Sequence, residues 1–563
     1  MNCNGMIPKV LFFPDRPLTD GDMSAIIHNM PQTDERIRVW HPDGHNGKPD
    51  AVIQMEKEKE SNMEKKGKYG RLLTNTALFT AGKFISKLLV FFMMRLYTSC
   101  LTPDQYSTAD LVVDMANLLI PLACLGISEG IFRNAAAREG NKEDFLNAGL
   151  WVLGVGSAGF LLLSPLLTLI PLFRTTAWLI VLYVLMSNLH AVVSQYLCAI
   201  GKTGLFAAQG IVNTALTVLL NILFLPILNL GVTGYVLSVV LADGLTTAFL
   251  VLCTRLWRSI RPLRRQERRP LVRSMLAFCL PLIPATLCWW VTGVSDRYMV
   301  AAMYSHAENG LYAAAYKIPT LLTYAVGIFD SAWRLSVAAE ADNREACAAF
   351  YTRVWRWYTT LSFVGGAVLI LGSRLFAGML FADAYQSAWM YVPVLTVATV
   401  FMGLDTFLGS VYFACRKTTG SMITALCGAG LNLLLNWLLI PTWGAMGASV
   451  ATLVSYGAVY VLRLITVRRL IPFRVEALRG TANVLLILTL CVAVTLTGGA
   501  GQLLSPTAWW LVAGGLGLVL LGVNGKALYE MGACAVRAVL RTSRKREQTA
   551  DPSAPEKGDT TGS

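Results

Sequence analysis

The chain has 563 residues, of which 55% are hydrophobic and only 15% are charged, and its mean hydropathy is +0.52. A soluble domain carries about 25% charged residues, so this composition excludes a soluble globular protein and equally a disordered, collagen-like or disulfide-stapled chain. The formal net charge of +14 resides in short segments between apolar runs, which is typical of cytoplasmic loops in membrane proteins and not of nucleic-acid binding.

The two ends of the chain are polar. Residues 1–70 contain one apolar run, Val10–Phe13, which is too short for the core of a signal peptide. We interpret residues 1–70 as a disordered cytoplasmic extension. Residues 541–563 are rich first in Arg and Lys and then in Asp, Pro, Ser and Gly, and are expected to form a disordered cytoplasmic tail.

Cysteine and histidine give no sign of a metal site or of structural disulfides. None of the twelve cysteines forms a C-x-x-C motif. His41 and His45 are four residues apart but are separated by Pro42 and Gly44, which indicates a loop and not the face of a helix. The sequence therefore predicts neither a bound metal nor another cofactor.

Between the polar ends lie fourteen apolar segments long enough to cross a bilayer, given about 20 residues per helical span. Most of the loops between them are short, which predicts that neighbouring helices are antiparallel. The predicted spans are 74–98, 108–132, 146–170, 176–200, 205–226, 232–254, 274–302, 311–333, 354–373, 387–414, 420–440, 445–466, 480–497 and 507–526.

Basic residues alternate between the two sides of this predicted bundle. The even-numbered loops and the adjoining span ends carry 23 Lys and Arg residues, eight of them in the loop 255–273, whereas the odd-numbered ones carry three at most. Loops rich in Lys and Arg stay on the cytoplasmic side. A miscounted span would reverse the alternation from that point onward, so its persistence predicts fourteen spans with both termini cytoplasmic.

The sequence repeats itself after six spans. In the fifth span Asn221 is followed five residues later by Pro226, and in the eleventh span Asn436 is followed five residues later by Pro441. Two glycines three residues apart come next in both copies, at Gly231 and Gly234 and at Gly444 and Gly447. A shift by an even number of spans preserves orientation, so the repeat predicts two parallel lobes related by an axis along the membrane normal.

These patterns predict an all-α membrane protein of about fourteen transmembrane helices, with two parallel six-helix lobes around a central cavity and two extra helices. The N-lobe covers residues 71–256, a basic cytoplasmic linker 257–273, the C-lobe 274–468, and spans 13 and 14 residues 479–530. Paired lobes of this kind are typical of transporters. Because the sequence shows no P-loop and no nucleophile motif, we do not expect an enzyme.

Two groups of motifs resemble those of polysaccharide and oligosaccharide flippases of the MOP superfamily, including the O-antigen flippases. The superfamily also contains the MATE exporters and the lipid II flippases. The resemblance covers residues 70 to 530 and leaves out the N-terminal extension. Its motifs are Asn75-Thr-Ala-Leu-Phe-Thr-Ala-Gly82, Arg95-Leu-Tyr-Thr98, Leu101-Thr-Pro-Asp-Gln-Tyr106, Asp296-Arg297-Tyr298 and Gly310-Leu-Tyr-Ala-Ala-Ala-Tyr-Lys-Ile-Pro319.

The resemblance implies a flippase in the bacterial plasma membrane. Such a protein moves an undecaprenyl-diphosphate-linked oligosaccharide from the cytoplasmic to the outer leaflet by alternating access, for the synthesis of surface polysaccharide. Its implied partners are the lipid-linked glycan, membrane lipids and, as a candidate, a polysaccharide polymerase. In lipid II flippases two extra helices line a groove for the lipid tail, and spans 13 and 14 resemble them in position and number.

Charged residues inside the spans are the candidate functional residues, because each costs roughly 2.5–3.5 kcal/mol to insert and therefore usually faces the bundle interior. Lys83 and Lys87 share a face of span 1 with Thr76 and Thr80, which favours a stripe facing the substrate's phosphates over two structural lysines. The candidate substrate-binding residues are Lys83, Lys87, Arg95, Arg297 and Lys317.

Four carboxylates are candidates for ion pairing or proton coupling, namely Asp114, Asp243, Asp296 and Asp405. We expect Asp114, with its neighbour Asp110, to pair with Arg95 or with the lysines of span 1. Asp296 and Arg297 either gate the outer mouth or extend toward the interface. Asp243 and Asp405 lie in mid-membrane, where they serve either as proton carriers or as salt-bridge partners.

Two alternatives remain open from the sequence. A MATE-like exporter of organic cations has the same lobes but should have a cavity dominated by carboxylates, which Lys83, Lys87 and Lys317 argue against. The other alternative is a membrane protein of envelope assembly that has kept the fold without transporting anything.

Pro281 and Pro284 interrupt span 7. A proline removes a backbone hydrogen bond and bends the helix.

Overall fold

The computed structural model describes residues 91–137, 141–339, 344–414, 418–470, 476–496 and 505–550. All regular structure in these ranges is helical, which confirms the predicted all-α fold. Lys83, Lys87 and the predicted extension 1–70 lie outside the described residues, as does most of the predicted C-terminal tail.

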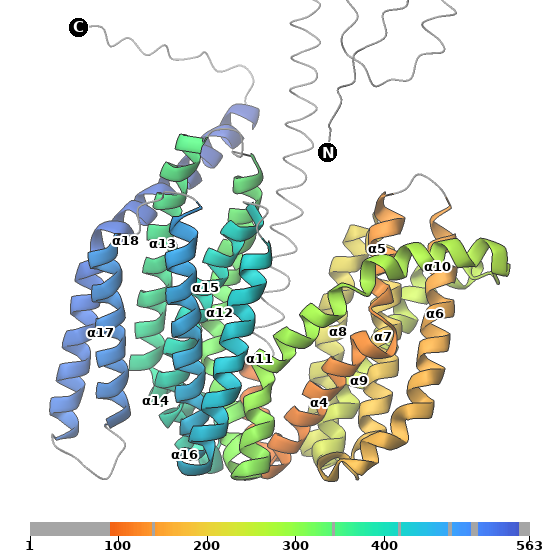
Figure 1. The fold of residues 1–563 in the computed structure, drawn as a ribbon, viewed down its shortest axis with the longest axis horizontal. Helices are drawn as coiled ribbons and strands as arrows, with labels where there is room; N and C mark the ends of the chain where they lie inside the picture. Colours follow the sequence, from red (N-terminus) through yellow and green to blue (C-terminus); the bar gives the residue numbers. More distant parts are fainter. Residues whose placement is uncertain are drawn as a thin grey trace, which may run out of the picture. The chain divides into compact units, whose positions relative to one another are not determined.

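The helices of the first half form one group, seen on the right of Figure 1. They are α3 (Met94–Cys100), α4 (Pro103–Ala123), α5 (Ile127–Ala137), α6 (Lys142–Leu163), η1 (Ser164–Leu169), η2 (Pro171–Phe173), α7 (Ala177–Ala199), α8 (Thr203–Ile222), η3 (Leu223–Ile227), α9 (Gly231–Thr254) and η4 (Leu256–Ser259).

The helices of the second half form the other group, and α11 runs between the two (Figure 1). They are α10 (Arg265–Cys279), α11 (Leu282–Met303), α12 (His306–Ala339), α13 (Arg344–Leu371), α14 (Ser373–Leu380), η5 (Asp383–Met390), α15 (Val392–Ala414), α16 (Thr418–Arg468), α17 (Ala477–Leu496) and α18 (Pro506–Ala550).

The described residues contain ten helices that are long and apolar enough to cross a membrane, or eleven when the bent pair α4 and α5 is taken as one span. One of the ten, α16, covers both predicted spans 11 and 12, which meet at the non-helical residue Gly444 (φ 55°, ψ −135°). The chain is therefore a multi-pass membrane protein. The count of fourteen stays a prediction, since most of span 1 precedes residue 91.

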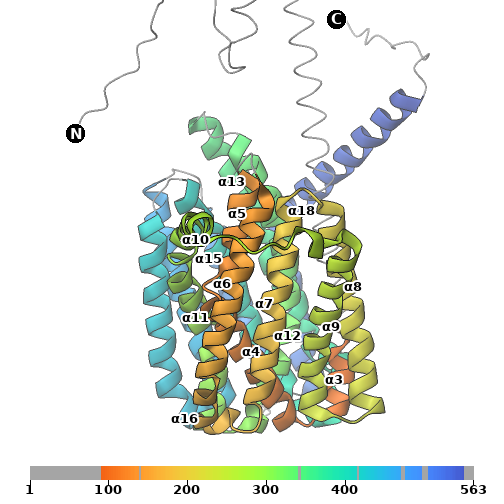
Figure 2. The same cartoon turned by 90° about the vertical axis from the view of Figure 1, so that its right-hand side faces the viewer.

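Two of the predicted spans, span 2 and span 7, are each divided into two helices. Span 2 bends by 54° between α4 and α5, where Leu125 and Gly126 both have left-handed backbones (φ 52° and 62°). Span 7 is broken between α10 and α11, and Pro281 lies in the gap, as its missing N–H group leads one to expect. Helix α10 lies across the end of the first group (Figures 1 and 2) and includes residues 265–273 of the predicted linker.

The backbone supports the predicted repeat. Gly231 and Gly444 both have φ of 55°, a conformation that glycine adopts at little cost. At Gly234 a Cβ atom would lie 3.2 Å from the Phe224 carbonyl oxygen, and at Gly447 it would lie 2.5 Å from the Leu439 carbonyl oxygen. Both lobes thus reverse direction in the same way, with a helix packed against the preceding carbonyl.

Buried apolar side chains form three clusters, and each of them includes residues from both groups of helices. The first group has one cluster around Ile127, Leu146 and Leu197, which Met275 of α10 joins, and another around Leu111, Leu179 and Val236. The largest cluster fills the second group and reaches Tyr97, Leu101 and Tyr106 of α3 and α4. The start of α4 is therefore packed against the opposite lobe.

The tight glycine of the repeat gives a first prediction. Gly447→Ala should destabilise the protein by roughly 1–3 kcal/mol, because the new methyl group overlaps the Leu439 carbonyl. Gly430→Ala, on the same helix, is the control: its Cβ meets no atom within 4 Å, and alanine favours a helix more than glycine does. Thermal unfolding of the purified protein measures both, and equal melting temperatures would contradict the packing described here.

Candidate functional site

One face of α4 carries ion pairs and hydrogen bonds to α11 and α12 of the opposite lobe. The helix begins with a capping box, in which the Thr102 side chain accepts from the Gln105 N–H and the Gln105 side chain accepts from the Thr102 N–H. Its residues Ser107, Asp110 and Asp114 follow at spacings of three and four, so they share a face. This face meets α11 and α12, and we refer to the polar contacts between them as the inter-lobe seam.

Arg297 of α11 is the centre of the inter-lobe seam. Its Nη1 atom lies 2.8 Å from Asp110 Oδ2 and 2.8 Å from Asp114 Oδ2, so one nitrogen bridges both carboxylates. The Arg297 side chain is only 11% exposed, and its guanidinium lies 5.3 Å from the centre of the Tyr316 ring. An arginine buried in this way is stable only with its partners in place.

Lys317 of α12 completes the charge balance. Its Nζ atom lies 3.4 Å from Asp110 Oδ1, on the other oxygen of the carboxylate that Arg297 holds. Two cations from the C-lobe therefore face two carboxylates from the N-lobe. Removing one member of such a cluster leaves a buried charge without compensation, which typically costs 3–5 kcal/mol.

Uncharged groups extend the inter-lobe seam on both sides of the ion pairs. Asn309 Nδ2 donates to Ser107 Oγ at 2.8 Å, the Tyr298 hydroxyl donates to the Leu111 carbonyl at 2.7 Å, and Trp290 Nε1 donates to the Asp114 carbonyl at 2.9 Å.

Gly310 explains how the backbones approach so closely at the start of α4. A Cβ atom there would lie 2.0 Å from the Pro103 carbonyl oxygen. The glycine of the Gly310–Pro319 motif thus lets the first turn of α12 contact the first turn of α4.

Asp296, next to Arg297, points into the C-lobe instead. Its carboxylate accepts from the Tyr312 hydroxyl at 2.6 Å and from Thr452 Oγ1 at 3.4 Å. A chain of buried amides continues from there, with Asn432 Nδ2 donating to Thr452 Oγ1 at 3.5 Å and Asn436 Nδ2 donating to Asn432 Oδ1 at 2.9 Å. Asn436, the asparagine of the repeat in the C-lobe, thus lies at the end of a polar path that begins beside the inter-lobe seam.

Asp243 lies inside the N-lobe, between α7, α8 and α9. Its carboxylate accepts from Ser187 Oγ at 2.5 Å and from Asn213 Nδ2 at 2.7 Å. Among the described residues it forms no ion pair. One turn along α9, Thr247 Oγ1 lies 3.2 Å from His190 Nδ1.

Asp405 has a cation of its own. Arg463 Nε lies 3.0 Å from Asp405 Oδ1, and both side chains are less than 10% exposed. Arg463 also donates to the Asp405 carbonyl oxygen at 3.1 Å and to Thr424 Oγ1 at 2.9 Å. Of the two roles considered for Asp405, this geometry favours the salt-bridge partner.

The predicted site residues thus divide into three sets. Asp114, Arg297 and Lys317 meet in the inter-lobe seam, and Asp296 adjoins it. Arg95 is exposed, and its Nη1 donates to the carbonyl of Phe381 and, at 3.5 Å, to that of Gly378, at the end of α14. Asp243 and Asp405 lie in separate lobes, while Lys83 and Lys87 lie outside the described residues.

Sequence reasoning missed two features of the site. It expected Asp114 to pair with Arg95 or the lysines of span 1 and did not foresee the pairing with Arg297 across the lobes. Pairing of Asp114 with Lys83 or Lys87 stays a prediction, because both lysines lie outside the described residues. It also counted Arg463 among the cytoplasmic loop charges, although Arg463 is buried and paired. The position of Arg463 inside the predicted span 445–466 is the signal in the sequence that would have pointed to a buried residue.

The comparisons with known proteins agree with this geometry. Residues 72–333 match the family model described as polysaccharide biosynthesis protein. The lipid II flippase MurJ in an inward closed conformation has a similar fold, with a TM-score of 0.59 at 13% identity, covering 81% of this chain and 99% of that one.

A multidrug-resistance MATE family transporter of the MOP superfamily is also similar. Its inward-facing conformation gives a TM-score of 0.56 at 15% identity, covering 71% of this chain and 96% of that one. Its outward-facing conformation gives 0.51 at 15% identity, covering 72% and 95%. No curated protein shows significant sequence similarity to the chain.

The ion pairs of the inter-lobe seam give a second prediction. Arg297→Met should destabilise the protein by about 3–5 kcal/mol, because two buried carboxylates are left facing one cation. Adding Asp114→Asn leaves Asp110 with Lys317 and should recover most of the loss. The melting temperature of the purified protein reports both effects.

Arg95→Met serves as the control, because Arg95 is exposed and its side chain forms no ion pair with any residue that the structure describes. Its melting temperature should stay close to that of the wild type. A loss for Arg297→Met no greater than that for Arg95→Met would show that the inter-lobe seam contributes little to stability.

Proposed function

We propose that the chain is a flippase of the MOP superfamily that moves an undecaprenyl-diphosphate-linked oligosaccharide from the cytoplasmic to the outer leaflet of the bacterial plasma membrane. The family match of residues 72–333 and the fold shared with a lipid II flippase and a MATE transporter support this proposal. The match to the polysaccharide biosynthesis family supports a glycan substrate. The product would serve the synthesis of surface polysaccharide, with a polysaccharide polymerase as a candidate partner.

The inter-lobe seam is the observation that carries this proposal. Alternating access requires two lobes that touch at one end of the bundle and can separate there. Here the contact consists of hydrogen bonds and ion pairs that run from Ser107, in the second turn of α4, to Asp114. Such a contact can open when water enters, because hydration of the separated charges compensates for most of the free energy of the buried ion pairs.

The seam lies at the side that we assign to the outside of the cell. Helices α4 and α12 both begin after odd-numbered loops, which carry few basic residues, and the seam begins within the first two turns of each helix. With the basic loops in the cytoplasm, we propose that the structure represents a state closed toward the outside.

The charge of the proposed substrate is complementary to the basic residues of the inter-lobe seam and to the lysines predicted for span 1. A diphosphate is anionic and offers many acceptor oxygens, so Lys and Arg bind it through charge-assisted hydrogen bonds. When the inter-lobe seam opens, Arg297 and Lys317 lose their carboxylate partners and become available to the phosphates. We propose that Lys83 and Lys87 of span 1 take up the same group from the cytoplasmic side.

Locking the inter-lobe seam tests the proposal. In a variant without native cysteines, Ser107→Cys and Asn309→Cys should be joined by a short reducible cross-linker, since the native side chains are 2.8 Å apart. Flipping of a lipid-linked oligosaccharide in vesicles should then fall to the background rate and recover after reduction. The matched control is Asn483→Cys with Asn524→Cys, which join α17 and α18 within one half of the chain.

Two results would contradict the proposal. Undiminished flipping with the locked seam would show that the lobes need not separate there. Absence of flipping by the unlocked protein, together with export of organic cations, would instead assign it to the MATE-like alternative.

Asp243 is the carboxylate that we propose to couple transport to protons. It accepts two hydrogen bonds from neutral groups and has no cationic partner among the described residues, whereas Asp405 is held by Arg463. Gaining or losing a proton at Asp243 would therefore change the charge of the N-lobe interior.

The response of flipping to a pH gradient tests this role. Wild-type rates should change with the gradient, and Asp243→Asn should flip at a rate that no longer does. Asp405→Asn, the control, should keep the response while losing stability, since Arg463 is left without its partner. A full gradient response in Asp243→Asn would exclude Asp243 as the coupling residue.

A further inference from the structure

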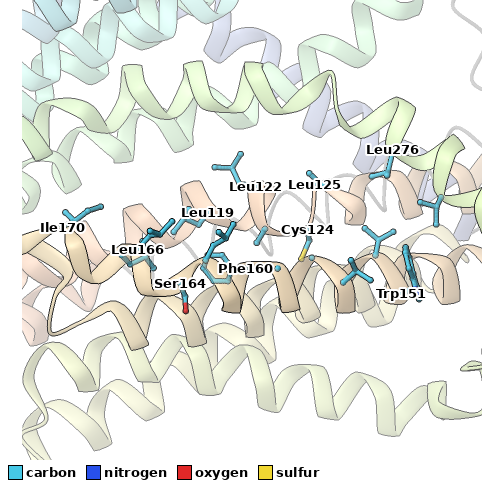
Figure 3. A pocket seen from close by; sticks show the side chains of 18 residues that line it. Leu119, Leu122, Cys124, Leu125, Trp151, Phe160, Ser164, Leu166, Ile170 and Leu276 are labelled. Carbon is cyan, nitrogen blue, oxygen red and sulfur yellow. The ribbon is translucent and has the colours of Figure 1, made fainter.

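A narrow apolar pocket of about 600 Å³ lies in the first half of the chain, between α4, α6 and α10 (Figure 3). Its lining is almost entirely hydrocarbon, and Ser164 supplies the one hydroxyl group. Figure 3 shows Trp151 and Leu276 near one end and Ile170 near the other. The pocket is separate from the inter-lobe seam, because none of the residues that line it belongs to the seam.

The length of the pocket suits a lipid chain. Its wall runs along α6 and η1 from Trp151 to Ile170, and at about 1.5 Å per residue this stretch rises on the order of 30 Å. The hydrocarbon core of a bilayer has a similar thickness of about 30 Å. Because α6 is a membrane span, the molecules that can reach an apolar pocket beside it are lipids.

Three arginines of α10 lie beside the end of the pocket that Trp151 and Leu276 form. On α10, Arg265, Arg268 and Arg269 lie one to three turns before Val272 and Leu276, at spacings that place all five on one face. Val272 and Leu276 line the pocket. The guanidinium of Arg268 lies 4.0 Å from the centre of the Trp151 ring, at the same end of the pocket.

These arginines have no acidic partner in the part of the chain that the structure describes. Arg261 of the preceding loop, by contrast, pairs with Asp144 at 2.5 Å. The one carboxylate on α10, Glu267, accepts from the backbone N–H of Arg264 at 3.3 Å. The positive charge at the mouth of the pocket therefore remains available to an anion from outside the protein.

We propose that this pocket binds an anionic phospholipid of the cytoplasmic leaflet. One acyl chain lies between α4 and α6, and the phosphate accepts hydrogen bonds from Arg265, Arg268 and Arg269. The apolar wall selects a lipid, and the arginines select a negative headgroup, since basic residues beside a membrane span attract anionic lipids. The bound lipid would hold α10 against α5 and α6, beside the break in span 7.

Native mass spectrometry of the purified full chain tests the site, with dioleoyl phosphatidylglycerol and dioleoyl phosphatidylcholine as the probes. Wild type should bind phosphatidylglycerol on the order of tenfold more tightly. Arg268→Gln with Arg269→Gln should remove that preference, because two charges near a headgroup account for about this factor. Arg255→Gln with Arg258→Gln, elsewhere in the same basic segment, removes equal charge and should keep the preference.

Filling the pocket tests the acyl chain separately. Gly159 lines the pocket, and a Cβ there meets no atom within 4 Å, so Gly159→Phe should occupy the space and weaken binding of both lipids. Gly154→Phe is the matched control, because Gly154 lies on the same helix with equal room but does not line the pocket. Gly159→Leu gives a smaller obstruction should the phenylalanine variant fail to fold.

Three outcomes would overturn the proposal. Equal affinity of the wild type for both lipids would exclude recognition of the headgroup. Unchanged phosphatidylglycerol binding in a folded Gly159 variant would exclude the pocket. If a polyprenyl phosphate displaced phosphatidylglycerol from the wild type but not from the Gly159 variant, the pocket would be assigned to the carrier lipid instead.

Discussion

A charge placed in hydrocarbon must meet an opposite charge or water, and this constraint organises the interior of the protein. Arg297 is nearly buried and bridges two carboxylates of α4, while Lys317 holds the second oxygen of one of them. Arg463 meets Asp405 in the same way. A buried ion pair has a free energy close to that of its two charges when each is hydrated. The pairs between the lobes can therefore be replaced by contacts with water or, in the proposed flippase, with a substrate anion. The pairs within a lobe, by contrast, hold helices of the same lobe together.

The internal repeat determines where such exchange can occur. Each lobe turns between its fifth and sixth spans through a glycine with φ of 55° and packs the next helix against a carbonyl, so the lobes are built alike and rigid at these points. The contacts of the inter-lobe seam join α4 to α11 and α12. In the proposed transporter, any separation of the lobes would therefore have to break these contacts.

Local patterns predicted the helices, the repeat and the residues that carry charge in the membrane. Hydropathy and loop charge are properties of short segments, and the Asn–Pro–Gly–Gly spacing was visible without any structure. Partners across the lobes were not: Asp114 and Arg297 are separated by 183 residues, and only the packing of α4 against α11 brings them together. The break of span 2 was likewise not predicted. It depends on the left-handed backbone of Leu125, a conformation that leucine rarely adopts and that the sequence therefore does not indicate.

The charge balance of the inter-lobe seam explains why closure and phosphate binding should alternate. Among the described residues two cations face two carboxylates and leave no net charge, so these four groups would offer the proposed diphosphate no electrostatic advantage while the seam is closed. Once the lobes separate, Asp110 and Asp114 remain on α4 while Arg297 and Lys317 move away with α11 and α12. The same four side chains then present a cationic surface on one lobe and an anionic surface on the other. In the proposed flippase, release of the phosphate would restore the neutral cluster, which would favour closure and return the protein to its starting state.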